Sequence, residues 1–332
     1  MRSIVLVFTL ALSSGVDARD KNDIRSALLE TLGVPPPSCS TAMHGVTRAV
    51  FAPTAAGTIW RVTYPSCGQR VSALVAVPRN ATPSTSVVLA LHQTSEYGSR
   101  EVMGLQGDER LGFGRRFYQA GFIVVAPDVF IAGENFDQRR GWDTTEFYRD
   151  TPQWSAMGRM LADHQRAIDA VKALGQAPNC IAAVGHSLGG HNALFLGALD
   201  NRVNVVVSVS GFERIATDDD AQRWARDSWF VYIPRLRPFV VQPKPRHLPW
   251  DFDDVLMAVH PRPLMIVQGK DDPIWSHEEL IADVAQTVAE AYQRAGIPER
   301  FRVILFEGGH EFPVQAQDEA IRFVRRTCHG PN

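Results

Sequence analysis

Six short, mainly apolar runs constrain the fold of this chain more than any other feature of its sequence. They lie at residues 87–91, 123–126, 181–184, 203–209, 264–267 and 302–306. Strands that are buried on both faces of a sheet have this continuous apolar pattern. Most of the runs are separated by stretches with helical spacing, at residues 108–120, 155–174, 188–199, 277–295 and 314–326. This alternation predicts an α/β fold, in which helices cover both faces of a mostly parallel sheet.

The residues ahead of these runs predict two further strands and a short N-terminal segment. Residues 58–64 and 70–77 alternate between apolar and polar side chains on either side of the turn 66–68. We therefore expect an antiparallel hairpin at one edge of an eight-stranded sheet. Residues 20–32 have helical spacing, which the prolines that follow bring to an end. The expected organisation is a helical and irregular segment over 19–57, followed by one α/β domain over 58–332.

One connection, over residues 212–262, is much longer than a normal crossover between parallel strands. It is rich in proline and aromatic residues, among them Trp224, Trp229 and Tyr232. Because it precedes the seventh expected strand, it predicts an insertion that folds as a cap over the carboxyl ends of the strands.

The charge and the N-terminus indicate the environment and the partners of the chain. A formal net charge of −2 over 332 residues, without any run of basic residues, argues against a nucleic-acid partner. Arg2, the apolar residues 4–12 and the small and polar residues up to Ala18 have the layout of a signal peptide over 1–18. We therefore expect a secreted or periplasmic protein, with an uncleaved N-terminal anchor as the alternative. No later apolar run is long enough for stable membrane insertion, and the sequence predicts no oligomeric state.

Export gives the four cysteines a structural interpretation, because disulfides persist in oxidising compartments. Cys39 and Cys67 both lie in the N-terminal part, so we expect them to pair. Cys180 begins an expected strand and Cys328 follows the last helical stretch, so the two meet if that helix returns to the far edge of the sheet. Four cysteines allow three pairings. No cluster of His and Cys residues predicts a metal site.

The pentapeptide Gly-His-Ser-Leu-Gly at 185–189 is placed between the strand 181–184 and the helical stretch 188–199. A Gly-x-Ser-x-Gly sequence in this setting predicts a nucleophile elbow, a sharp turn that holds the serine hydroxyl above the sheet. The glycines leave room where side chains would collide with neighbouring elements. Ser187 is therefore the candidate nucleophile.

A serine hydroxyl needs a base, which an acid orients. Two later strand ends supply these groups, because Asp272 follows the run 264–267 and His310 follows the run 302–306. The order Ser187, Asp272, His310 is that of α/β-hydrolase triads. Asp271 is the rival acid. We expect His186 and His191, which lie next to the serine and on the following helix, to have packing or polar roles.

The same reaction needs two backbone N–H groups directed at the developing oxyanion. We expect one from Leu188, at the start of a helix where the dipole also favours negative charge. The other is expected from Gln93, in the loop after the strand 87–91. His92, in the same loop, is a candidate for the substrate pocket or for a structural role.

These motifs give the chain a resemblance to the α/β-hydrolase superfamily, and within it to the dienelactone-hydrolase and acetyl-xylan-esterase-like branch. The resemblance rests on residues 185–191, on Ala-Pro-Asp at 126–128, on residues 260–264 and on Gly-Gly-His at 308–310, and it covers about residues 70–326. The chain departs from it in two places. It has Gln93 where many members have glycine, and Ser187 where dienelactone hydrolases proper have cysteine.

The resemblance implies a serine hydrolase that cleaves carboxylic esters through an acyl-enzyme, without a metal or an organic cofactor. Trp142, Trp229 and Trp275 are expected, with His92, to line the substrate pocket. Export and this pocket fit a small-molecule or carbohydrate ester, such as an acetyl or other short-acyl ester of a polysaccharide. The alternatives are a serine peptidase and a catalytically silent binding protein on the same fold.

Overall fold

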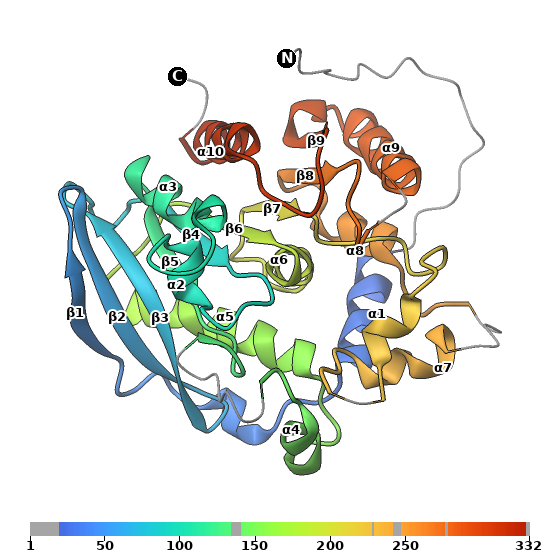
Figure 1. Ribbon diagram of the computed structural model, residues 1–332, viewed down its shortest axis with the longest axis horizontal. Coiled ribbons are helices and arrows are strands. Elements are labelled where there is room, and N and C mark those ends of the chain that lie inside the picture. Colours follow the sequence, from blue (N-terminus) through green and yellow to red (C-terminus); the bar gives the residue numbers. More distant parts are fainter. Residues whose placement is uncertain (1–19, 134–140, 228, 242–246, 276–277, 330–332) are drawn as a thin grey trace.

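The computed structural model describes residues 20–133, 141–227, 229–241, 247–275 and 278–329. In this part of the chain, nine strands form one sheet in the order β1-β2-β3-β5-β4-β6-β7-β8-β9 (Figure 1). The strands are β1 Thr47–Pro53, β2 Gly57–Ser66, β3 Gln69–Pro78, β4 Val87–Leu91, β5 Ile123–Pro127, β6 Ile181–His186, β7 Val205–Val209, β8 Leu264–Gly269 and β9 Phe301–Phe306. Pairing is antiparallel from β1 to β5 across β2 and β3, and parallel from β5 onward. The expected α/β fold is confirmed.

The helices alternate with the parallel strands, as the helical spacing predicts. They are α1 Lys21–Leu32, α2 Ser99–Val102, α3 Phe113–Gln119, α4 Thr145–Asp150, α5 Ala156–Ala173, α6 Leu188–Leu199, α7 Arg237–Val240, α8 Phe252–Val259, α9 Glu278–Arg294 and α10 Val314–His329. Local signals set several of their starts. The Ser155 side chain accepts a hydrogen bond from the Gly158 amide at the start of α5, and Asp251 and Asp254 form a capping box at α8.

The sheet has one strand more than the eight expected. β1 lies within the segment 19–57 that was expected to be helical and irregular, and it pairs with β2, with a register shift between Val50 and Ala52. β1 is an edge strand with no buried residue. A strand that buries neither face needs no alternation of apolar and polar residues, so the pattern that revealed the other strands is missing here.

Two separate cores cover the two faces of the sheet. Alternate residues of β4 face opposite ways, so that Val87, Leu89 and Leu91 join one core while Val88 and Ala90 join the other. The first core contains α1, α5, α6, α8 and α9, and the second contains α3 and α10. Each fully buried aliphatic or aromatic side chain contributes about 1.5–3 kcal/mol of transfer free energy.

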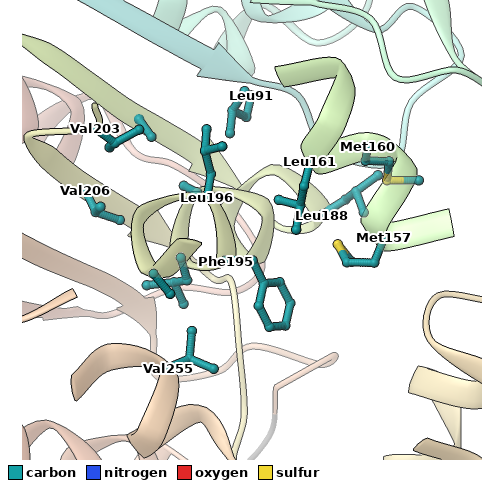
Figure 2. Close-up of a cluster of buried hydrophobic side chains, with 14 of the residues drawn as sticks. Leu91, Met157, Met160, Leu161, Leu188, Phe195, Leu196, Val203, Val206 and Val255 are labelled. Carbon is teal, nitrogen blue, oxygen red and sulfur yellow. The ribbon is translucent and has the colours of Figure 1, made fainter. Parts of the chain in front are cut away.

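Helix α6 carries the residues that follow the serine, and it is buried on nearly all sides. Figure 2 shows its residues Phe195 and Leu196 among side chains of α5, β7 and α8, such as Leu161, Val206 and Val255. Because neighbours surround α6 along its length, its position relative to the sheet is fixed. The packing therefore holds the first turn of α6 in place at the edge of the sheet.

Part of the expected cap belongs instead to the helix layer. Helix α8, the last element of the connection 212–262, packs against α6 and α1 like an ordinary crossover helix. The earlier part of the connection forms short helical turns whose aromatic side chains pack together: Trp224 is 6.2 Å from Trp275 and 5.8 Å from Tyr232 between ring centroids. The aromatic residues of this segment therefore serve mainly as a small core of their own.

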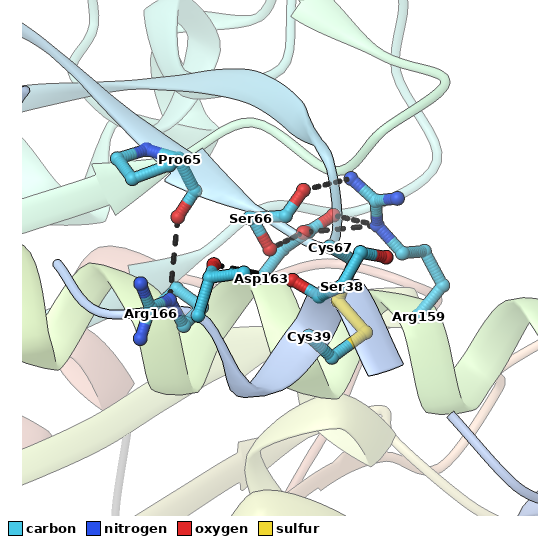
Figure 3. The surroundings of a disulfide bond; sticks show 9 residues. Ser38, Cys39, Pro65, Ser66, Cys67, Arg159, Asp163 and Arg166 are labelled. Carbon is cyan, nitrogen blue, oxygen red and sulfur yellow. Dashed lines mark hydrogen bonds and ion pairs between the residues drawn. A yellow bond between two sulfur atoms is a disulfide. The ribbon is translucent and has the colours of Figure 1, made fainter. Parts of the chain in front are cut away.

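The structure contains two disulfides, Cys39–Cys67 and Cys180–Cys328. The first joins the turn between β2 and β3 to the segment after α1. Figure 3 shows it next to a buried ion pair, in which Arg159 donates from Nε to both oxygens of Asp163 at 3.0 Å. Ser66, just before the turn, also donates to Asp163. Arg159 in turn donates from Nη2 to the carbonyl of Ser66 at 3.3 Å. The turn is thus joined to the ion pair of α5 by hydrogen bonds of Ser66 and to the N-terminal segment by the disulfide.

Candidate active site

Three strand ends converge at one edge of the sheet. Strands β6, β8 and β9 are parallel and paired in register through β7, so their carboxyl ends lie along the same edge. Ser187 follows β6, Asp272 follows β8, and His310 follows β9. Ligand and catalytic sites of open α/β sheets lie at this edge.

Ser187 occupies a strained turn between β6 and α6. Its φ of 54° and ψ of −119° lie in a region that non-glycine residues rarely adopt. Its N–H donates to the carbonyl of Val209 at 2.9 Å, and its side chain does not cap α6. Ser187 is partly exposed, whereas the residues on either side of it are buried. The turn therefore leaves the hydroxyl accessible at the edge of the sheet.

The glycines around Ser187 allow this turn. A Cβ on Gly185 would lie 2.0 Å from the carbonyl oxygen of Gly189, and a Cβ on Gly189 would lie 1.9 Å from that of Leu91. Both distances are far below van der Waals contact, and the atoms that would collide belong to the backbone, which cannot move aside like a side chain. Only glycine therefore fits at these two positions. The second contact also shows how closely the start of α6 approaches the end of β4.

Asp272 and His310 are directly hydrogen-bonded. Nδ1 of His310 lies 2.9 Å from Oδ2 and 3.0 Å from Oδ1 of Asp272. Asp272 is 2% exposed, and its Oδ1 also accepts from the amides of Ile274 and Trp275 at 2.9 and 3.1 Å. Burial by itself would raise the pKa of Asp272, but the hydrogen bonds from His310 and the two amides outweigh it and lower the pKa. The neighbouring Asp271 is exposed and directed into solvent, and its amide donates to Gly308.

The orientation of His310 follows from this contact. With Nδ1 donating to a carboxylate, the proton is on Nδ1 and the lone pair is on Nε2. The side chain of His310 is 15% exposed, so the imidazole ring that carries Nε2 is partly accessible to solvent. This is the tautomer that a general base needs.

His186 contacts His310, which the sequence gives no reason to expect. The two ring centroids are 4.8 Å apart, and His186 is 2% exposed. Burial, with a smaller effect from His310, lowers the pKa of His186 to about 3, so its imidazole is neutral. His191 is also buried, against Trp224 and Tyr232, and burial lowers its pKa to about 3 as well.

Leu188 and Gln93 come from two segments that lie against each other. A Cβ on Gly189 would lie 2.9 Å from the carbonyl oxygen of His92, so the first turn of α6 touches the loop that holds Gln93. The N–H of Leu188 is one of the first helical amides, which have no intrahelical acceptor. The side chain of Gln93 is buried and donates to Glu101.

His92 supports this loop through both of its ring nitrogens. It is 1% exposed; its Nδ1 lies 2.6 Å from the carbonyl of Gln93, and its Nε2 accepts from the amide of Val129 at 3.2 Å. Burial lowers the pKa of His92, so it acts as a neutral bridge. Both ring nitrogens are used within the protein, as the structural role that the sequence left open for His92 requires, and its place in the substrate pocket stays a prediction.

The three candidate pocket tryptophans differ in exposure. Trp275 is 4% exposed and donates to the carbonyl of Ser210 at 2.7 Å, and Trp142 is 8% exposed with its ring 5.2 Å from Phe230. Trp229 is 49% exposed. Packing thus leaves Trp229 as the candidate with a large surface for a ligand, while Trp275 is a core residue.

Tyr232 is a site residue that the sequence did not single out beyond its aromatic class. Its side chain is partly buried in the insertion and is hydrogen-bonded to Thr94, the residue after Gln93. This contact joins the insertion to the loop beside the serine. No local signal in the sequence marks a contact between segments so far apart.

Comparison with known proteins identifies the fold. Residues 71–226 match the model of the dienelactone hydrolase family, a stretch that includes the elbow at Ser187 and ends before Asp272 and His310. The chain has the fold of the α/β-hydrolase superfamily. The sheet order and the turn at Ser187 described above agree with this fold, and the resemblance seen in the sequence is confirmed at the level of the fold and of the family match over residues 71–226.

Individual relatives of this chain are distant in sequence. The protein YtaP of Bacillus subtilis, assigned as a hydrolase, is 23% identical over 62% of the chain and 65% of its own length, so the chain spans less than two thirds of that relative. A glucuronoyl esterase from Solibacter usitatus has a TM-score of 0.70 at 14% identity, covering 93% of this chain and 92% of its own. A Bacteroides fragilis protein assigned as an acetyl xylan esterase has a TM-score of 0.65 at 20% identity, covering 94% and 83%. At such identities the structures establish the fold.

Within residues 20–133, 141–227, 229–241, 247–275 and 278–329, no group of three or more His, Cys, Asp or Glu side chains could hold a metal ion. In the same ranges, no helix is long and apolar enough to cross a membrane. The expected signal peptide, residues 1–18, lies outside the described part of the chain.

Proposed function

We propose that the chain is a serine esterase in which Ser187, His310 and Asp272 act as nucleophile, base and acid. The observation that carries this proposal is the part-buried hydrogen bond between His310 and Asp272, at the sheet edge where the strained turn presents Ser187. The family match supports a hydrolase, and the structural neighbours named as esterases support ester bonds as the target.

In the proposed reaction, Nε2 of His310 accepts the proton of Ser187 as Oγ attacks the ester carbonyl. The N–H groups of Leu188 and Gln93 stabilise the oxyanion. Protonated His310 then gives its proton to the departing alcohol, which leaves an acyl-enzyme. His310 next deprotonates water, which releases the acid and restores Ser187. Asp272 holds the Nδ1–H tautomer throughout and stabilises the imidazolium that forms in each half-reaction.

We propose a carbohydrate ester with a small acyl group, such as acetyl, as the substrate. Two neighbours carry the names glucuronoyl esterase and acetyl xylan esterase, whose substrates are carbohydrate esters. Trp229, 49% exposed in the insertion, offers an aromatic face of the kind on which sugar rings stack. The signal-peptide layout of residues 1–18 and the two disulfides support a secreted or periplasmic location.

The test is labelling of the purified chain with a fluorophosphonate probe, followed by hydrolysis of an ester panel. The wild type should be labelled at Ser187 and should hydrolyse 4-nitrophenyl acetate and acetylated xylan, whereas Ser187→Ala should lose both properties. Loss of activity by several orders of magnitude is expected for removal of a nucleophile. Near wild-type hydrolysis by Ser187→Ala would overturn the assignment.

The same assays separate the two alternatives. A serine peptidase would be labelled as well, but it would cleave aminoacyl-arylamides in preference to simple esters. A silent binding protein would show neither labelling nor turnover. Silent binding proteins on this fold commonly lose one of the catalytic residues. The hydrogen bond between His310 and Asp272 therefore favours a working enzyme.

A further inference from the structure

A cavity of about 360 Å³ lies at the edge of the sheet opposite to Ser187. Its lining includes Ser86, Phe122 and Asn179, which precede β4, β5 and β6, together with Arg325 and residues at the end of α10. These are the amino ends of strands whose carboxyl ends border the candidate active site. The cavity is therefore separated from that site by the length of the sheet.

The walls of the cavity are fixed by bonds between distant segments. The amide of Asn179 donates to the carbonyl of Ser84 at 3.1 Å. The disulfide Cys180–Cys328 joins the residues next to the Asn179 wall and the α10 wall. A cavity with walls tied in this way needs little ordering when a ligand binds, and ordering is a main cost of association.

Hydroxyl groups dominate one wall. Oγ1 of Thr82 lies 3.0 Å from Oγ of Ser84 and 3.3 Å from Oγ1 of Thr85. Ser86 is 1% exposed, and its Oγ has no hydrogen-bond partner among the described residues. A buried hydroxyl without a partner is destabilising, so Ser86 Oγ is a group with which a ligand in the cavity can form a hydrogen bond.

The opposite wall carries a positive charge. Nη2 of Arg325 donates to the carbonyl of Ala120 at 2.7 Å, and this holds a guanidinium that has further N–H groups to offer. None of the ten lining residues is an aspartate or a glutamate, and no ion pair of Arg325 is found in the described ranges. Arg325 is exposed, and its guanidinium also lies over the ring of Phe122, with 6.0 Å to the ring centroid. The cavity is therefore open to solvent and offers hydroxyl groups, one amide side chain and a cation without an acidic partner in its walls.

We propose that this cavity binds a small hydroxylated anion, a sugar acid or a sugar phosphate of monosaccharide size. Its volume lies at the lower end of the range of about 300–1,000 Å³ for small-molecule sites. The anionic group pairs with Arg325, and the sugar hydroxyls exchange hydrogen bonds with Ser86 and the threonine and serine hydroxyls beside it. The proposal is independent of the esterase proposal, because the two sites share no residue.

Calorimetric titration of the full chain with D-glucuronate, glucose 6-phosphate and glucose tests this proposal. We expect saturable binding of at least one of the two anions and weaker binding of glucose. Arg325→Gln should weaken binding of the anion at least about fivefold, since it removes a charge-assisted contact. Arg326→Gln is the matched control, because Arg326 is an exposed neighbour on the same helix that does not line the cavity, and it should bind like the wild type.

Ser86→Ala gives an independent readout. It should weaken binding severalfold while the melting temperature of the unliganded protein stays the same or rises, because an unpaired buried hydroxyl is removed. Ser187→Ala should leave the binding unchanged, whatever it does to hydrolysis. The proposal is overturned if neither anion binds at millimolar concentrations, if Arg325→Gln binds as tightly as Arg326→Gln, or if blocking Ser187 abolishes binding.

Discussion

The ring of His186 packs against the ring of His310, with 4.8 Å between their centroids. His186 is buried and neutral, and neither of its ring nitrogens has a hydrogen-bond partner within the described residues. It therefore supports one face of the proposed base by packing alone, while Asp272 holds Nδ1 by a hydrogen bond. The orientation of His310 depends on both contacts, because the hydrogen bond fixes a direction and the packing limits rotation about it.

Replacement of His186 should lower turnover more than substrate affinity. His186→Ala removes the packing surface, so we expect kcat to fall about 10- to 100-fold through misplacement of the base, with KM changed much less. His186→Phe keeps a ring in the same place and should retain most of the activity. Steady-state kinetics on 4-nitrophenyl acetate give both parameters. Equal losses in the two variants would show that packing against His310 is not the role of this side chain.

The two neighbouring aspartates should differ sharply in their effect on hydrolysis. Asp272→Asn should lower kcat/KM by about 10³- to 10⁴-fold, because an amide no longer selects the Nδ1–H tautomer or stabilises the imidazolium. Asp271→Asn, the matched control, should change kcat/KM less than about threefold, since Asp271 is exposed. Rates of ester hydrolysis with purified variants decide the point. Similar losses in both would contradict the assignment of the acid.

Buried histidines should make the protein less stable as the pH falls. Burial lowers the pKa of His164, His186 and His191 to about 3 in the folded chain, whereas an unfolded histidine has a pKa of about 6.5. Between these values the unfolded chain binds more protons, so the free energy of unfolding decreases as the pH falls from about 6.5 toward 3. Above this window the three residues are neutral in both states and contribute no pH dependence.

Removal of one of these histidines should flatten that dependence. His164→Leu should reduce the slope of the unfolding free energy against pH by up to about 1.4 kcal/mol per pH unit, because one proton uptake is lost. His44→Leu is the control, since His44 is exposed and should leave the slope unchanged. Urea denaturation at several pH values between about 4 and 7 measures the slope. An unchanged slope in His164→Leu would mean that His164 is protonated in the folded chain.

The two disulfides should contribute unequally to stability. Cys180–Cys328 closes a loop with a sequence separation of 148, and Cys39–Cys67 closes one of 28. Loop-closure entropy therefore predicts a larger loss for the pair Cys180→Ser and Cys328→Ser, within the usual range of about 2–5 kcal/mol. Thermal unfolding of the two double variants under reversible conditions measures the difference. Hydrolysis per folded molecule should stay the same, because both disulfides lie away from Ser187.

The sequence by itself determined the sheet, the elbow and the order of the candidate catalytic residues. Each depends on a local pattern: continuous apolar runs for buried strands, glycines around Ser187, and polar residues directly after a strand. The tertiary structure decided what local patterns do not encode. Edge strand β1 buries no face and so leaves no pattern, and only packing shows that Asp272, rather than Asp271, contacts His310. The contact of His186 with His310, and the polar cavity at the sheet edge opposite to Ser187, likewise join residues more than a hundred positions apart. Such proximity arises from burial and chain topology.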